Sequence, residues 1–298
     1  MVPVVTLQGG LGNQLFQWFF AHTINDKEFR LTTHTMRIKS TAAVRNTEIS
    51  PLIDNCNHFI GAENNQPGVS PGLTILFRGL SAMWEKELFR YFLELNGYIR
   101  DDLRSNFPKT SRLPKRILFA DGYFQANATV ESVWPVAERE LLPYLKDLSF
   151  ELMKSFNIPE QFTAIHVRRA DKVENDIHAK EHIGILNDDY FINALNVESR
   201  PFLVVFTENK SQIEELCARI KPDLILDSVS LSAWDTLALM SNASTFIGSN
   251  SSLSWWGAKV AAKSGKSAIL PNSWSQHHNI DSILLNFESL RYCNSIWM

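Results

Sequence analysis

The stretch Phe162-Thr-Ala-Ile-His-Val-Arg-Arg169 opens the part of the sequence that decides the fold. It is a short apolar segment that ends in two arginines, and four similar segments follow it at Phe202–Thr207, Leu224–Leu226, Thr245–Gly248 and Ser267–Leu270. Helix-length segments separate them, at Asp189–Leu195, Ser211–Ile220, Ala233–Ser241 and Ser254–Lys263. Strands and helices that alternate at this spacing indicate βαβ crossovers and a parallel sheet. The second half of the chain is therefore predicted to be an α/β domain.

The helix expected at Ser211–Ile220 carries a start signal. Ser211 is followed three residues later by Glu214, the spacing of a capping box, and apolar residues then recur at helical period. The sequence therefore predicts a helix that begins at Ser211.

The first half is less regular. It opens with an expected strand at Val4–Leu7, a Gly-rich turn and a helix with one apolar face, formed by Leu15, Phe16, Phe19 and Phe20. Further elements are expected as a helix at Met83–Leu95, a strand at Arg116–Asp121 and a helix across Val130–Leu145. The polar tract Arg37–Pro71 shows turn signals and little periodicity. One βα set gives way to another around Leu148–Pro159, so we predict two domains, residues 1–150 and 151–298.

Composition and charge exclude several classes of protein. The chain has 298 residues, 45% of them hydrophobic, as in an ordinary globular protein of two domains. Its 29 basic and 32 acidic residues leave a net charge of −3, so no bulk positive field is available to hold a nucleic acid. The three cysteines lie far apart, without the spacing of a zinc site or a disulfide framework, which favours a reducing compartment. No stretch approaches the roughly 18 apolar residues of a membrane helix.

The Gly-rich turn Gly9-Gly-Leu-Gly-Asn-Gln14 lies between the first expected strand and helix. Glycine allows a tight turn that presents backbone N–H groups at a helix N-terminus, where a phosphate or sugar oxygen can bind. The third glycine of a dinucleotide fingerprint would fall at Leu15, which disfavours a dehydrogenase. The alternative is a tight turn that needs glycine for steric reasons alone.

A basic cluster, His166-Val-Arg-Arg-Ala-Asp-Lys172, ends the strand quoted above. Ligands of parallel sheets gather at the carboxyl ends of the strands. Strand alternation sends His166 and Arg168 to one side of the sheet, and guanidinium groups match phosphate oxygens. We therefore expect His166 and Arg168 to bind an anion. For Arg169 and Asp171 an ion pair that pins the loop is the favoured interpretation.

The third segment of interest, Ser249-Asn-Ser-Ser252, ends a strand ahead of a helix. Small hydroxyl residues at a helix N-terminus can donate to a phosphate. Asp235, at the start of the preceding helix, either accepts the N–H groups of a guanine edge or caps that helix. We assign Trp255 and Trp256 to the core.

Four motifs, taken together, resemble the α-1,2-fucosyltransferase family, glycosyltransferase family 11. They are Gly9-Gly-Leu-Gly-Asn-Gln-Leu-Phe16, Gly122-Tyr-Phe-Gln125, His166-Val-Arg-Arg-Ala-Asp171 and Asn250-Ser-Ser-Leu-Ser-Trp-Trp-Gly-Ala258, in the family's order. The resemblance spans nearly the whole chain. It implies an α/β, GT-B-like fold of two Rossmann-like domains with a cleft between them. It also implies a GDP-fucose donor, a galactoside-containing glycan as acceptor, inversion at the anomeric carbon, and no metal or other cofactor.

The resemblance further implies roles for individual residues. Arg168 would hold the GDP diphosphate, with His166 as a neighbouring donor and Arg169 in support, while Asp235 would read guanine. The strand end of the second domain would contribute Ser249, Asn250, Ser251 and Ser252 to donor binding, the last two at the β-phosphate. From the first domain, the acceptor side, Gly10, Gly12, Asn13 and Gln14 would line the cleft.

Catalysis by inversion needs a base near the attacking hydroxyl. Two carboxylates follow the basic cluster, and the resemblance to α-1,6-fucosyltransferases puts Asp176 first and Glu174 second in that role. Each is alternatively a solvated loop charge.

Two departures from the family pattern bear on specificity. Ala170 and Lys172 make the basic cluster look like that of α-1,6-fucosyltransferases, so linkage is less certain than donor. The strand end reads Thr207-Glu208-Asn209 where many family members have Ser-Asp-Asp, which puts the role of the first Asp in doubt.

The sequence leaves other functions open. They are a fucosyltransferase of another, α-1,6-like linkage, a GT-B enzyme for another nucleotide sugar, and a non-catalytic relative that binds nucleotide sugars or carbohydrates. The expected setting is a bacterial cytoplasm, with peripheral contact to a membrane-borne acceptor and no nucleic-acid partner.

Overall fold

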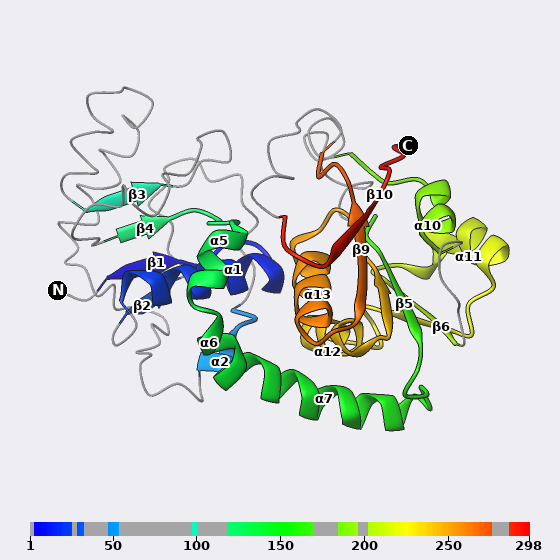
Figure 1. Ribbon diagram of the computed structural model, residues 1–298, viewed down its shortest axis with the longest axis horizontal. Helices are drawn as coiled ribbons and strands as arrows, with labels where there is room; N and C mark the ends of the chain where they lie inside the picture. Colours follow the sequence, from blue (N-terminus) through cyan, green and yellow to red (C-terminus); the bar gives the residue numbers. More distant parts are fainter. Residues whose placement is uncertain are drawn as a thin grey trace. The chain divides into compact units, whose positions relative to one another are not determined.

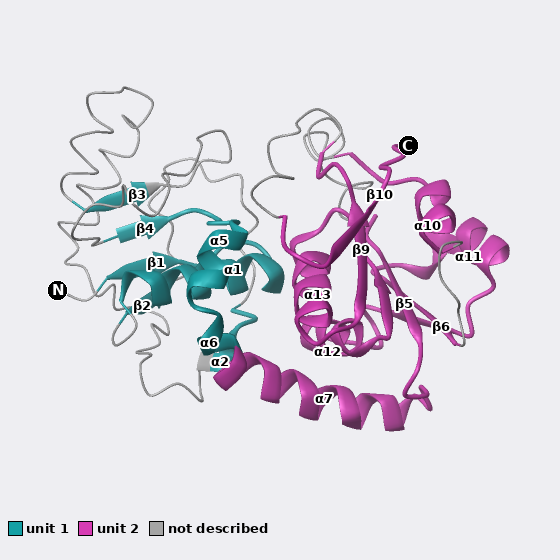
Figure 2. Ribbon diagram, in the orientation of Figure 1, with its two compact units in different colours: residues 1–137 teal, residues 138–298 magenta. Residues whose placement is uncertain are grey.

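The computed structural model describes residues 3–25, 29–32, 47–53, 97–100, 119–169, 184–195, 202–275 and 286–298 (Figure 1). The chain forms two compact units, Met1–Ala137 and Glu138–Met298 (Figure 2). The domain boundary predicted near residue 150 falls inside helix α7, Leu142–Ser155. This helix belongs to the second unit, because it packs against helix α12, Ala233–Asn242.

The second unit is built on a six-stranded parallel sheet. Its strands are β5 (Thr163–Val167), β6 (Leu203–Thr207), β7 (Leu224–Asp227), β8 (Thr245–Ile247), β9 (Ser267–Pro271) and β10 (Leu290–Cys293). They lie side by side in the order β7-β6-β5-β8-β9-β10. Numbered within the unit this is 3-2-1-4-5-6, the order of a doubly wound Rossmann fold. The five predicted strands and the α/β class of this unit are thus confirmed, and β10 is an additional edge strand. The GT-B-like arrangement of two Rossmann-like domains stays a prediction.

The described helices of this unit that follow β5 match the predicted ones, with one correction. They are α10 (Asp188–Leu195), α11 (Glu214–Ile220), α12 and α13 (Ser252–Lys263). The predicted start at Ser211 is wrong, because a 3₁₀ turn, Lys210–Ile213, precedes α11. Asn209 caps this turn, since its Oδ1 accepts the N–H of Ser211 at 3.0 Å. Asn209 thus takes the N–H of Ser211, which the side chain of Glu214 would accept in a capping box, and the expected capping box does not form.

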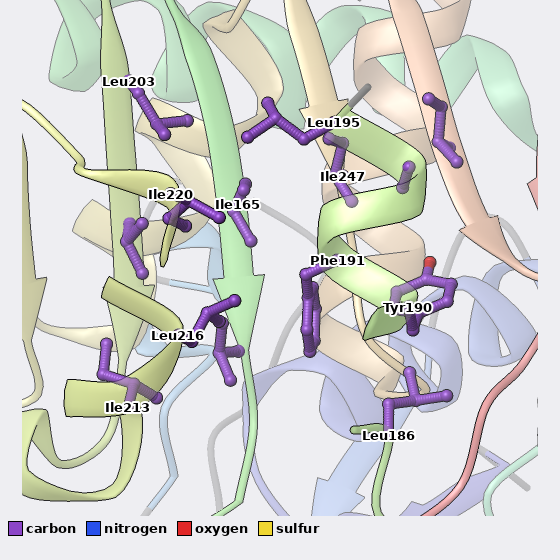
Figure 3. Packing of buried hydrophobic residues seen from close by; sticks show 14 residues of the cluster. Ile165, Leu186, Tyr190, Phe191, Leu195, Leu203, Ile213, Leu216, Ile220 and Ile247 are labelled. Carbon is purple, nitrogen blue, oxygen red and sulfur yellow. The ribbon is translucent and has the colours of Figure 1, made fainter. Parts of the chain in front are cut away.

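One hydrophobic layer of the second unit lies on the face of the sheet covered by α10 and α11. Ile165 and Val167 of β5 point into this layer, where they join Phe191 of α10 and Leu216 of α11. Figure 3 shows Ile165, Phe191 and Leu216 among the residues of this layer. Strand alternation sends the intervening residue, His166, to the opposite face. The predicted separation of His166 from Val167 is therefore confirmed.

The first unit contains a parallel sheet of four described strands. They are β1 (Val4–Thr6), β2 (Arg30–Thr32), β3 (Tyr98–Arg100) and β4 (Phe119–Asp121), in the order β2-β1-β4-β3. Helix α1, Leu11–Ile24, follows β1, and its predicted apolar face is fully buried. A short helix, α2 (Ser50–Ile53), is also described. The strands predicted at Val4–Leu7 and Arg116–Asp121 are confirmed as β1 and β4. The helix predicted at Met83–Leu95 lies outside the described residues, as does the tract Arg37–Pro71 apart from residues 47–53.

The helix predicted across Val130–Leu145 is divided into several pieces. They are α5 (Asn127–Ser132), α6 (Trp134–Val136), a π-helical turn (Ala137–Leu141) and α7. Pro135 and Pro143 stand in the first turns of α6 and α7. Proline has no N–H to donate within a helix and is tolerated in the first turn, so each proline starts a new segment. In the described part of the chain no helix is both long and apolar enough to cross a bilayer.

Gly248, which follows β8, is required by close packing. A Cβ atom at this position would lie 2.6 Å from Leu270 Cδ2 and 2.9 Å from Ser254 Cβ. We expect Gly248→Ala to lower the free energy of unfolding by about 1–3 kcal/mol through overpacking, measured by urea denaturation. Gly257→Ala is the matched control, because its Cβ would meet Met240 no closer than 3.2 Å. A loss in Gly257→Ala as large as in Gly248→Ala would contradict this account.

Candidate functional site

The order of the strands reverses between β5 and β8. From β5 the chain moves to β6 on one side, and it later returns to β8 on the other side. Ligands of open α/β sheets bind at the carboxyl ends of the strands at such a switch point. Two predicted motifs end these two strands: His166 to Arg169 at β5, and Ser249 to Ser252 at β8. The structure therefore brings together two segments that are some 80 residues apart in the sequence.

His166 links these two segments. Its Nδ1 lies 2.7 Å from Oγ of Ser254, in the first turn of α13. The same Oγ accepts the N–H of Ser249 at 3.2 Å. His166 is 4% exposed, so its ring is part of the packing beneath the switch point. Ser254 was not predicted as a site residue, because only the tertiary pairing of β5 with β8 brings it to His166.

Arg168 leaves the end of β5 with a partly exposed side chain. Its Nε lies 3.4 Å from Oε1 of Glu208, which follows the neighbouring strand β6. The Arg168 side chain is 23% exposed and the Glu208 side chain 25%. Arg168 is therefore accessible at the edge where a ligand would bind, and Glu208 is a neighbour that the sequence did not assign to it.

Arg169 is buried and its guanidinium is engaged with the protein. Nη2 pairs with Oδ1 of Asp188 at 2.5 Å, and Nη1 donates to the backbone oxygen of Gln212 at 3.0 Å. Arg169 therefore forms a buried ion pair with Asp188, a partner that the sequence did not assign to it. The predicted pair with Asp171 stays a prediction, because Asp171 lies outside the described residues. Contact between Arg169 and the sugar donor stays a prediction.

Helix α13 begins at the switch point without a side-chain cap. Ser251 occupies the N-cap position, but its side chain makes no capping hydrogen bond. The first N–H groups of a helix have no partner within the helix, and with the helix dipole they attract anions. Asn250 is tied into the fold, because its Nδ2 donates to Gly184 O at 3.3 Å and to Trp274 O at 3.2 Å. The N-terminus of α13, from Ser251 to Ser252, is thus suited to a phosphate.

Asp235 forms a capping box with Ser232 at the start of α12. Its Oδ2 accepts the N–H of Ser232 at 2.9 Å, and Ser232 Oγ accepts the N–H of Asp235 at 3.1 Å. The capping interpretation is therefore confirmed, and guanine recognition by Asp235 stays a prediction.

Burial, and secondly the charge of Asp235, raises the pKa of the Tyr144 phenol above its usual value.

The Gly-rich turn of the first unit meets the Gly122–Gln125 motif. Gln125 Nε2 donates to Asn13 Oδ1 at 2.7 Å. Gly9 has φ +72°, and a Cβ there would lie 2.3 Å from Asn13 Nδ2. The steric interpretation of glycine therefore holds at Gly9, which needs both a left-handed backbone and space for Asn13.

The N-terminus of α1 holds a carboxylate of the chain itself. Leu11 N–H donates to Oε2 of Glu48 at 2.9 Å. Gln14 fixes this arrangement, because its Oε1 accepts the N–H of Glu48 at 2.8 Å and its Nε2 donates to Gly9 O at 2.9 Å. A phosphate at this turn would be repelled by Glu48. Glu48 therefore disfavours a phosphate at this turn, and the predicted roles of Gly10 and Gly12 in lining the cleft stay predictions.

The predicted bases Asp176 and Glu174 lie outside the described residues, as do Ala170 and Lys172. Among the residues that are described, no group of three or more His, Cys, Asp or Glu side chains could hold a metal ion.

One family model matches most of the chain, and the named relatives are glycosyltransferases. The family model described as Glycosyl transferase family 11 matches residues 1–286. The O-antigen biosynthesis glycosyltransferase WbnK of Escherichia coli is 22% identical over 311 residues, covering 94% of this chain and 97% of that protein. An alpha-1,2-colitosyltransferase of Escherichia coli is 32% identical over 127 residues, covering 40% of this chain and 43% of that protein. Among solved structures, POFUT1 in complex with GDP matches with a TM-score of 0.46 and 12% identity, covering 90% of this chain and 98% of that one.

The Glu48 contact makes a prediction about stability. Glu48→Ala removes the carboxylate that caps α1, so we expect the free energy of unfolding to fall by about 1 kcal/mol. The free energy of unfolding of Glu48→Gln should lie between those of the parent chain and Glu48→Ala, because glutamine keeps an acceptor and loses the charge. Urea denaturation checks this, with the exposed Glu151→Ala on α7 as a control that should change little. Equal stability of Glu48→Ala and the parent chain would show that the contact contributes nothing.

Proposed function

This chain belongs to glycosyl transferase family 11, and on that premise we propose that it transfers L-fucose from GDP-fucose to a galactoside hydroxyl in α-1,2 linkage. The family match covers residues 1–286 and thus both compact units. The family and the named relatives directly support a glycosyltransferase that is related to fucosyl- and colitosyltransferases. The donor nucleotide, the sugar and the linkage are the proposed part.

The observation that carries the proposal is that two adjacent strands, β5 and β8, lead at one switch point to Arg168 and to the N-terminus of α13, which has no side-chain cap. Transfer of a sugar from a nucleoside diphosphate breaks the bond between the anomeric carbon and the diphosphate, so negative charge develops on the leaving group. A guanidinium and helix N–H groups can stabilise that charge. We therefore assign the diphosphate to Arg168 and to the N-terminus of α13 at Ser251 and Ser252. Because these groups neutralise the leaving group, the proposed reaction requires no divalent metal.

Inversion follows from a single displacement in this scheme. The acceptor hydroxyl attacks the anomeric carbon from the face opposite the diphosphate, while a base takes the hydroxyl proton. Asp176 is the first candidate for that base and Glu174 the second, as the resemblance to α-1,6-fucosyltransferases implies. His166, buried against Ser254, would hold the β5 and β8 ends in place for the donor.

The proposed linkage and acceptor rest on the relatives. One relative is named an alpha-1,2-colitosyltransferase, and another is named for O-antigen biosynthesis. We propose a surface-polysaccharide precursor as the acceptor, which the enzyme would meet by peripheral contact with a membrane. Colitosyl transfer is the competing activity that the first of these names favours.

Nucleotide binding tests the donor site. Arg168→Ala should weaken GDP binding by about a hundredfold, because a charge-assisted contact to the diphosphate is lost. Titration calorimetry measures this, with GDP, UDP and dTDP compared on the parent chain. Arg219→Ala is the matched control, since its exposed ion pair with Asp189 is remote in sequence from both site motifs. Undiminished GDP affinity in Arg168→Ala would rule out the phosphate assignment.

Product analysis tests the reaction. Incubation of the protein with GDP-fucose and β-galactosides should release GDP and yield an α-1,2-linked fucoside, identified by NMR. An α-1,6 product would assign the other linkage, and a parallel reaction with a colitosyl nucleotide would reveal a preference for that sugar. GDP binding without any product under these conditions would favour a non-catalytic relative.

A further inference from the structure

Glu208 connects the ends of β5 and β6. Strands β5 and β6 pair in parallel with Val167 opposite Thr207, so Arg168 and Glu208 leave the sheet side by side. Oε1 of Glu208 lies 3.4 Å from Arg168 Nε, and Oε2 accepts the N–H of Arg169 at 3.3 Å. The carboxylate thus holds both the side chain of Arg168 and the backbone directly after it.

Glu208 is itself held by the next loop. Its backbone oxygen accepts the hydroxyl of Ser228 at 2.9 Å, and Ser228 follows β7. Close by, Asp227 Oδ1 accepts both the N–H and the hydroxyl of Ser230. Three successive strand ends are therefore joined at the edge of the sheet. Arg168 and Glu208 are each about three-quarters buried, so solvent screens their attraction less than that of a surface pair.

We propose that Glu208 is a positioning residue for Arg168, which fixes the plane of the guanidinium for the diphosphate of the nucleotide sugar. This inference rests on the proposed function in so far as Arg168 binds that diphosphate. An unrestrained arginine side chain has rotamer entropy to lose when it binds a ligand. A side chain that is already paired has lost part of that entropy beforehand, so binding costs less. One carboxylate at Nε also sets the direction in which the planar fork faces.

Positioning and bare electrostatics predict opposite results here. Glu208 is negative, and a diphosphate is negative too. If the charge of Glu208 acted on the ligand alone, its removal would strengthen nucleotide binding. If Glu208 acts through Arg168, its removal weakens binding, and it does so only while Arg168 is present.

A double-mutant cycle on the full chain separates these possibilities. The dissociation constant for GDP would be measured by calorimetry, with competition for weak binders, in the parent, Glu208→Ala, Arg168→Ala and the double variant. We expect Glu208→Ala to weaken GDP binding by about tenfold in the parent and by less than about twofold in the Arg168→Ala background. Glu208→Gln keeps an acceptor and should lose less than Glu208→Ala. Asp189→Ala, which removes an exposed partner of Arg219, is the control and should leave GDP affinity unchanged.

The other outcomes overturn the inference. Tighter binding in Glu208→Ala would show simple repulsion, and an equal loss in both backgrounds would show that Glu208 contacts the nucleotide or acts on the whole fold. Thermal unfolding of each variant identifies a loss of folded protein, which lowers the amount that binds without changing the dissociation constant. If the parent prefers UDP or dTDP, the proposed donor fails, and the cycle is measured with the preferred nucleotide because the diphosphate is common to all. If the parent binds none of them, both proposals fail.

Discussion

The parallel pairing of β5 with β6 on one side and β8 on the other is the constraint on which the second unit depends. β5 is buried along its whole length, so its alternate residues are committed to two opposite layers. Ile165 and Val167 pack into the hydrophobic layer under α10 and α11, and His166 therefore faces α13. Because all neighbours run parallel, their carboxyl ends share one edge, and the polar residues that follow them converge there. Arg168, Glu208 and the Ser249 segment are neighbours for this reason.

Carboxylates at the ends of elements decide where a ligand anion can bind. Glu48 accepts the first N–H of α1, and Asp235 accepts the N–H of Ser232 at the start of α12. The start of α13, in contrast, has no side-chain cap. The sequence suggested an anion at both the Gly-rich turn and the Ser-rich turn, and the chain's own charges distinguish them. The turn at α1 already holds a negative charge, whereas the turn at α13 follows β8, which pairs with the strand that ends before Arg168.

Sequence periodicity was sufficient for most of the fold, because buried strands and amphipathic helices repeat their apolar residues at periods of 2 and 3.6. It failed for elements with little such repetition. β10 is a partly exposed edge strand, and β2 and β3, though no shorter than β1 and β8, each include an arginine that interrupts the apolar run. It also misplaced the start of the helix near Ser211, because a cap from Asn209 and one from Ser211 look alike in sequence and differ only in backbone geometry.

The sequence alone determined the α/β class, the parallel sheet of the second half and the motifs that identify the family, since these depend on local periodicity and on residue type. Tertiary structure decided which of the polar residues act together. The pairs Arg168 with Glu208, His166 with Ser254 and Leu11 with Glu48 are separated by 40, 88 and 37 positions. No local pattern records such pairs, because strand order and the placement of helix ends create them. Tertiary structure also gives two adjacent arginines different environments. Arg168 is partly exposed at the edge of the sheet, whereas Arg169 is buried and paired with Asp188.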